Sequence, residues 1–113
     1  MSEKFTITPG TGVHVVRAGG AIIAETSRAL ILRENGYQPV VYFPREDGGM
    51  EFLDPSDKRT ICPHKGEATH YDIAAKSGPI RDAAWSYEAP MAGAEAIAGY
   101  LAFYNDKATV EAL

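Results

Sequence analysis

Residues 13–25, VHVVRAGGAIIAE, decide the fold that we expect for this chain. Two runs rich in Val and Ile lie on either side of the sequence Ala18-Gly19-Gly20. β-Branched residues favour extended backbone, and glycine supplies the positive φ angles that a tight hairpin turn needs. The stretch therefore predicts two antiparallel strands, at residues 13–17 and 21–25.

Short apolar runs between turn residues continue along the rest of the chain, which is typical of a β-rich domain. Residues 27–34 fit a strand or a short helix, and the Asn35-Gly36 turn that follows them favours the strand. Further strands are expected at residues 40–43, 50–53, 68–74, 83–87, 100–104 and 108–112.

The exception lies near the C-terminus, where apolar residues at positions 91, 94, 97 and 101 follow helical spacing behind Pro90. Proline suits a first helical position, and glycines within the segment limit the helix to about two turns. The expected fold class is mainly β with one short helix near the C-terminus. The length of 113 residues predicts a single domain that spans residues 1–113.

The composition excludes several classes of protein. Hydrophobic residues make up 45% of the chain and charged residues 23%, which is typical of a folded domain and not of a disordered chain. The net charge of −4 opposes a nucleic-acid backbone or an anionic membrane, so neither partner is expected. A single cysteine can form neither an internal disulfide nor a four-cysteine zinc site, and no cofactor is expected.

The start of the chain and its hydropathy predict the location. The first residues lack the apolar core of a signal peptide. No run approaches the roughly 20 apolar residues of a membrane-spanning helix. We therefore expect a cytoplasmic protein whose thiol stays reduced.

The densest group of chemically active side chains is TICPHKG, residues 60–66. A turn there would bring the ammonium of Lys65 near the sulfur of Cys62, and a nearby cation raises the thiolate fraction of a cysteine. Cys62 and Lys65 are therefore the candidate catalytic residues. The alternative is a small buried cysteine beside a solvated lysine.

Two larger constellations can be drawn around Cys62. His70 and Asp72 are two residues apart, so they share one face of a strand, which we expect to be exposed. With Cys62 they would supply a nucleophile, a base and an orienting acid, and the alternative is a solvated strand face. Cys62 and the histidines at positions 14, 64 and 70 lack the paired spacing of structural zinc, so no metal is expected.

Aromatic side chains offer a wall for a ligand. Trp85 and Tyr87 share a strand face, and Tyr42 and Tyr71 would complete a cage around a flat apolar group. Two large aromatics on one strand usually belong to a core, although they also form pockets. Arg28 would hold an anionic group or remain a solvated charge.

Five segments, in this order, resemble the bacterial family called domain of unknown function 427, which is also labelled nucleotidyltransferase-like. They are ETSRA at 25–29, YFP at 42–44, CPHKG at 62–66, AWSY at 84–87 and GYLAFY at 99–104. The resemblance covers about residues 13–112. The nucleotidyltransferase label gains no support from the residues, because there is no paired-aspartate metal site with a Gly-Ser motif.

The resemblance implies a β-tent fold, in which two antiparallel sheets are pinned together at one end. That fold is similar to Yippee proteins and to the thalidomide-binding domain of cereblon, where an aromatic cage binds cyclic imides. Several relatives of the fold hold zinc through two Cys-x-x-Cys pairs. This chain has only Cys62, so the resemblance implies the fold without the metal.

The predicted function is a small-molecule-binding module. Its pocket would be lined by Tyr42, Cys62, Lys65, Tyr71, Trp85 and Tyr87, with Arg28 at the rim. The cations would bind an anionic or carbonyl group of the ligand, and the aromatics its flat apolar part. One alternative is a transferase or hydrolase with Cys62 as nucleophile and His64 or His70 as base. The other is a domain that binds a peptide end, and an exposed strand edge allows a homodimer in each case.

Overall fold

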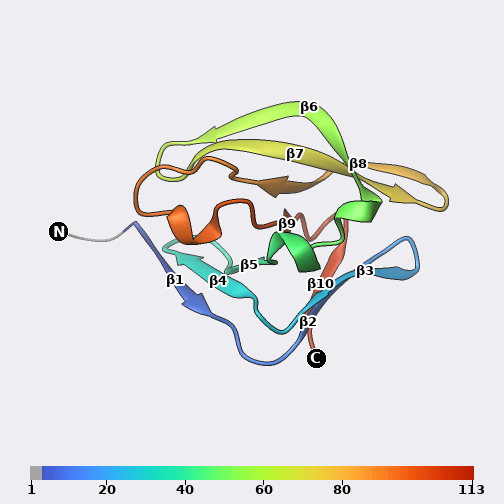
Figure 1. The fold of residues 1–113 in the computed structure, drawn as a ribbon, viewed down its shortest axis with the longest axis horizontal. Coiled ribbons are helices and arrows are strands. Elements are labelled where there is room, and N and C mark those ends of the chain that lie inside the picture. The colour runs from blue at the N-terminus through green and yellow to red at the C-terminus, as the bar shows by residue number, and fades with distance from the viewer. Residues whose placement is uncertain (1–3) are drawn as a thin grey trace.

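The computed structural model describes residues 4–113, which form three antiparallel sheets (Figure 1). The strand orders are β1-β4-β5, β10-β2-β3 and β6-β7-β8-β9. In chain order, β1 to β10 are Phe5–Pro9, His14–Ala18, Ala21–Thr26, Leu30–Glu34, Val40–Tyr42, Leu53–Cys62, Gly66–Ala75, Gly78–Ser86, Ala102–Phe103 and Thr109–Ala112. The mainly β fold class is therefore confirmed.

The hairpin predicted from residues 13–25 is confirmed. Strands β2 and β3 pair antiparallel, and the turn between them places Gly19 and Gly20 at φ angles of +57° and +82°. The next segment forms strand β4 and not a helix. A turn that includes Gly36, at a φ of +86°, leads the chain into β5, which pairs antiparallel with β4. The two predicted turns therefore define the four strands β2 to β5.

The short helix predicted near the C-terminus is wrong. The segment contains only η3, a single 3-10 turn at Glu95–Ile97. Gly93 and Gly99 take φ angles of +96° and +74°, which a right-handed helix cannot contain. Leu101, which had been expected on the apolar face of the helix, pairs instead with Phe43 in an isolated β-bridge.

The strand predicted at residues 50–53 is also wrong, because Met50–Phe52 forms a 3-10 turn, η2. A second such turn, η1, spans Arg45–Asp47. Between them, Gly49 takes a left-handed φ of +75° with the carbonyl oxygen of Ile23 directly beside it. This close approach packs the two turns against β3.

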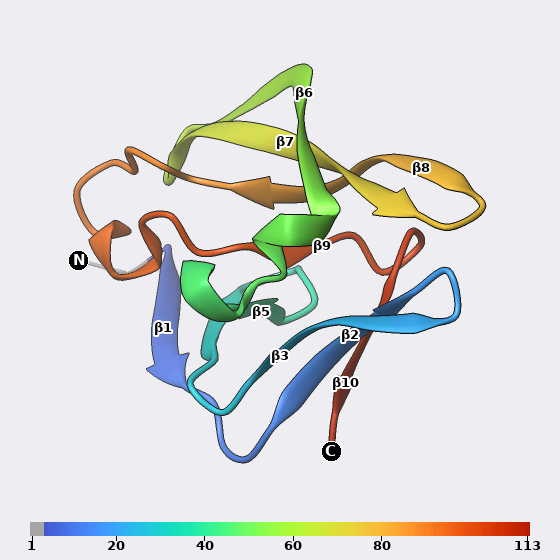
Figure 2. The ribbon, with the colours of Figure 1, turned by 45° about the vertical axis from the view of Figure 1, so that its right-hand side comes forward.

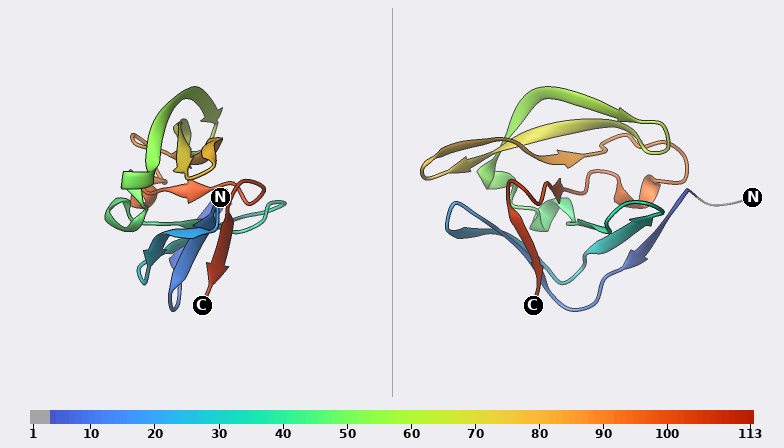
Figure 3. Two further views of the ribbon diagram at one scale, coloured as in Figure 1. Left: turned by 90° about the vertical axis from the view of Figure 1, so that its right-hand side faces the viewer. Right: turned by 180° about the vertical axis from the view of Figure 1, so that it is seen from behind.

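The sheets form two layers, which backbone hydrogen bonds between Phe43 and Leu101 join. The upper layer in Figures 1 and 3 holds β6, β7 and β8, and the two three-stranded sheets lie below it. Phe43 donates its N–H to Leu101 over 2.8 Å and accepts one back over 2.9 Å. The resemblance implied two antiparallel sheets pinned together at one end. The described residues instead form three sheets, and the two sheets of the lower layer diverge in Figure 2.

Side chains between the layers form two core clusters. The first surrounds Phe43, Tyr71 and Leu101. The second contains Leu32, Tyr42, Ala68, Tyr87, Ala94, Ile97 and Ala102, with Cys62 and Trp85 packed against it. The second cluster positions the candidate site. No helix in residues 4–113 is both long and apolar enough to cross a membrane.

Candidate functional site

A cavity of about 540 Å³ opens beside the second core cluster. This volume lies within the range of about 300–1,000 Å³ that is typical of small-molecule sites. Strands β4, β5 and β8 and the turn between β6 and β7 supply its walls. Five of the predicted site residues line it: Tyr42, Cys62, Lys65, Trp85 and Tyr87.

The turn between β6 and β7 places Cys62 and Lys65 at the cavity. Cys62 ends β6 and pairs with Gly66, and the Lys65 N–H donates to the Cys62 carbonyl over 3.3 Å. Gly66 takes a φ of +115°, which favours glycine. The carbonyl of Lys65 accepts the N–H of Met91 over 2.9 Å, so the turn is fixed to the segment that follows β8.

The ammonium of Lys65 has a carboxylate partner. Its Nζ lies 3.0 Å from Oε1 of Glu34 and 5.2 Å from the centre of the Phe5 ring. Lys65 is only 7% exposed, so the pair forms a fixed part of the cavity wall. This part of the wall therefore offers a hydrogen-bond donor, the ammonium, beside an acceptor, the carboxylate. The pair as a whole carries no net charge. The thiol of Cys62, which is half-buried, lines the same cavity.

The aromatic wall presents protonated phenols. Tyr42 and Tyr87 are buried, and burial raises the pKa of both hydroxyls. The Trp85 indole N–H opposes the shift at Tyr42, whereas Cys62 adds to the shift that brings the pKa of Tyr87 to about 12. Both phenols keep their protons at neutral pH. Trp85 packs edge-on to Tyr42, with ring centres 6.3 Å apart at 87°.

Tyr71 lies outside this cavity, in the first core cluster. Its hydroxyl donates to the carboxylate of Glu88 and accepts from Nη2 of Arg45 over 2.9 Å. Tyr71 pairs with Ala84 across the sheet, whereas its neighbour His70 pairs with Trp85. Adjacent residues of a strand point to opposite faces, so Tyr71 faces away from the side that carries Trp85.

Arg28 also lies elsewhere, beside the 3-10 turn η1. Its Nη2 lies 3.1 Å from Oδ2 of Asp47 and 3.6 Å from Oε1 of Glu46. Thr26 donates to the same Asp47 oxygen over 2.8 Å. The guanidinium thus ties the segment between β3 and β4 to η1. It does not reach the rim of the cavity, because none of these residues lines it.

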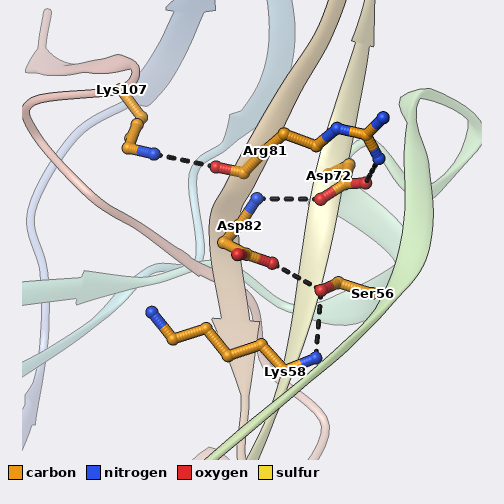
Figure 4. A network of polar contacts seen from close by, with 6 residues as sticks. All are labelled: Ser56, Lys58, Asp72, Arg81, Asp82 and Lys107. Carbon is orange, nitrogen blue, oxygen red and sulfur yellow. Dashed lines mark hydrogen bonds and ion pairs between the residues drawn. The ribbon is translucent and has the colours of Figure 1, made fainter.

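The expected exposure of His70 and Asp72 is wrong, since both are buried. Nε2 of His70 lies 3.0 Å from the Tyr104 hydroxyl. The Asp72 carboxylate accepts the N–H of Asp82 over 2.8 Å and an N–H of Arg81 over 3.1 Å (Figure 4). These separate hydrogen bonds leave no contact in which Asp72 orients His70, so the described residues do not assemble the triad with Cys62.

The network around Asp72 holds an irregular part of the upper sheet. Both neighbours of β7 shift register there, and Asp82 takes a φ of +51°. Figure 4 shows Ser56 bound to Asp82, and Lys107 donating to the carbonyl of Arg81. Within residues 4–113 no three His, Cys, Asp or Glu side chains are grouped to hold a metal ion.

Sequence reasoning missed several residues of the cavity, and Glu34 is the one that pairs with Lys65. It follows Leu32 at the two-residue period of β4, and both line the cavity. The alternation was a usable signal for a shared face. The partnership with Lys65 has no local signal, because Glu34 ends β4 and Lys65 lies in the turn between β6 and β7, which belong to another sheet.

Comparison with known proteins identifies a family for this chain but gives no activity. A family model described as "Domain of unknown function (DUF427)" matches residues 6–112. The match therefore includes all of strand β1 except Phe5, and this strand lies before the residues that carried the resemblance in sequence. No curated protein matches the chain.

Proposed function

The chain belongs to the DUF427 family, a domain of unknown function, and from this premise we propose that it is a small-molecule-binding module. The observation that carries the proposal is the cavity of about 540 Å³, in which aromatic walls meet a fixed ion pair and a thiol. Pockets of this size with a few convergent polar groups are the usual form of ligand sites.

The ion pair narrows the chemistry of the ligand. A full anion near Lys65 would also stand near the Glu34 carboxylate, which repels it. A neutral amide avoids this repulsion, because its carbonyl oxygen accepts from the ammonium and its N–H donates to the carboxylate. Tyr42, Trp85 and Tyr87 would contact the flat apolar part. We therefore favour the carbonyl ligand over the anionic one.

The setting that we propose is the cytoplasm of a bacterium. Reducing conditions there keep a thiol such as that of Cys62 free. The ligand would then meet an unmodified cysteine at the wall of the cavity.

Native mass spectrometry of the purified protein, before and after denaturation, tests the proposal. We expect an organic mass that is lost on unfolding, or, for protein purified bare, a shift of the indole N–H resonance on titration with benzamide. Trp85 is the single tryptophan, so this resonance is unambiguous.

Matched variants identify the site. Leu32→Phe should fill the cavity and abolish retention of the ligand or the benzamide shift, since Leu32 lines it. Phe52→Leu removes a 38% exposed aromatic that does not line the cavity, and it should behave as wild type. Unchanged binding in Leu32→Phe, or no bound mass together with no benzamide shift, would overturn the proposal.

A further inference from the structure

We propose that the ligand site continues past Trp85 into a second hollow, so that the ligand is an elongated molecule with a polar end and an uncharged aromatic end. The inference rests on the proposed function, since the polar end would occupy the cavity already described. The second hollow has a volume of about 240 Å³ and shares Gln38, Val40 and Trp85 with the cavity.

The Trp85 indole is a wall of both spaces. Its ring lies at 87° to that of Tyr42, which lines the cavity. It also packs against Tyr104, which lines the second hollow, with ring centres 4.4 Å apart. A ligand held against the indole in the cavity therefore reaches the second hollow by passing the shared residues Gln38, Val40 and Trp85.

The small volume of the second hollow indicates that it forms one part of a larger site. Its volume is below the roughly 300 Å³ at which independent small-molecule sites begin. The adjoining cavity is more than twice as large. The hollow is thus suited to one ring or branched group of a molecule whose other end is bound in the cavity.

The distribution of charge indicates which end of the ligand lies in which space. The cavity contains the Lys65–Glu34 pair, whereas the residues of the described chain that line the second hollow are all uncharged. Apolar side chains from three strands contribute to its lining, namely Val41, Phe103 and Val110. Desolvating a charged group there would gain no ionic partner, so the uncharged end belongs in this hollow.

The wall that Tyr104 forms, which packs against Trp85, is already fixed. The Tyr104 hydroxyl lies 3.0 Å from Nε2 of buried His70, and the two rings stack with centres 5.9 Å apart. The Tyr104 N–H also donates to the carbonyl of Ala83 over 2.9 Å. A wall held in this way needs little ordering when a ligand arrives, which favours binding.

Two probes test the inference: benzamide, which fits the cavity alone, and 4-benzyloxybenzamide, whose flexible ether carries a second ring past the indole. We expect the longer probe to bind at least about tenfold more tightly, as measured by the indole N–H shift. Intermolecular NOEs should connect its benzyl ring to the methyl groups of Val41 and Val110.

A matched pair of variants separates the two spaces. Val110→Phe should fill the second hollow and remove the advantage of the longer probe while benzamide binds as before. Thr109→Phe adds the same ring at an exposed neighbour that does not line the hollow, and it should keep the advantage.

The outcomes distinguish the two proposals. If benzamide and the longer probe bind with equal affinity, the second hollow is overturned and the proposed function stands. The same holds if NOEs connect the benzyl ring of the longer probe to Ile61 and none connect it to Val41 or Val110. Absence of any indole shift with either probe, together with no bound mass in native mass spectrometry, would overturn both.

Discussion

The ammonium of Lys65 lies 3.0 Å from the carboxylate of Glu34, although 31 positions separate the two residues in the chain. Lys65 lies in the turn between β6 and β7, and Glu34 ends β4, so the pair ties the upper layer to the lower one. The backbone joins these layers through Phe43 and Leu101. The ion pair is a further attachment, made by side chains, and it forms part of the cavity wall.

Removing the carboxylate should destabilise the protein. Glu34→Gln leaves the buried cation of Lys65 without its countercharge, and we expect the free energy of unfolding to fall by about 2 kcal/mol, since Glu34 is partly solvated. Urea denaturation followed by tryptophan fluorescence measures this. Glu111→Gln, which breaks the exposed pair with Arg17, should cost no more than about 0.5 kcal/mol. Equal losses in the two variants would contradict a structural role for the Lys65–Glu34 pair.

Gly49 should be intolerant of a side chain. A Cβ there would lie 2.1 Å from the Ile23 carbonyl oxygen, and the φ of +75° is unfavourable for other residues. We expect Gly49→Ala to lower the free energy of unfolding by at least about 3 kcal/mol, because backbone must move as well as adopt a strained angle. Gly20→Ala has a similar φ and open space, so its cost should be only about 1 kcal/mol. Thermal unfolding of both variants would show this difference, and similar melting temperatures would refute the steric argument.

The strands were predictable where their signals are local. The hairpin of residues 13–25 and the turn at Gly36 depend on neighbouring residues, and both were predicted correctly. The expected C-terminal helix failed because glycine conformation and the pairing of Leu101 with Phe43 outweighed apolar spacing. Strand β1 was not predicted, although Phe5 and Ile7 alternate with threonines and pack against the second cluster.

The site was predictable only in part, because strand periodicity gives relative faces and not absolute ones. Trp85 and Tyr87 share a face by their spacing, and both line the cavity. Nothing in the sequence says which face of β7 lies over that cavity, so Tyr71 was grouped with residues that it does not meet. The carboxylate partner of Lys65 comes from another sheet, and such a contact has no local pattern.

Alkaline pH should weaken the fold through Tyr87. Burial raises the pKa of Tyr87 to about 12, whereas an unfolded tyrosine ionises near pH 10. The stability that comes from the protonated phenol is therefore complete below about pH 10 and is lost as the pH rises towards 12. Urea titrations between about pH 10 and about pH 12 measure how steeply the free energy of unfolding falls with pH. Tyr87→Phe should make this fall less steep by up to about 1.4 kcal/mol per pH unit. Tyr37→Phe, at a 73% exposed position, is the control and should follow wild type. A slope unchanged in Tyr87→Phe would refute the assignment.

Acid should weaken the fold through His70. Burial lowers the pKa of His70 and nearby Lys58 lowers it further, while Asp82 acts in the opposite direction. An unfolded histidine binds its proton near pH 6.5, so the stability due to neutral His70 is present above that pH and is lost as the pH falls through the lower value of the folded state. Between about pH 7 and about pH 5, His70→Gln should therefore lose less unfolding free energy than wild type does. His64→Gln removes a half-buried histidine in the turn between β6 and β7 and should track wild type. Parallel curves for wild type and His70→Gln would show that the buried imidazole does not set the acid limit.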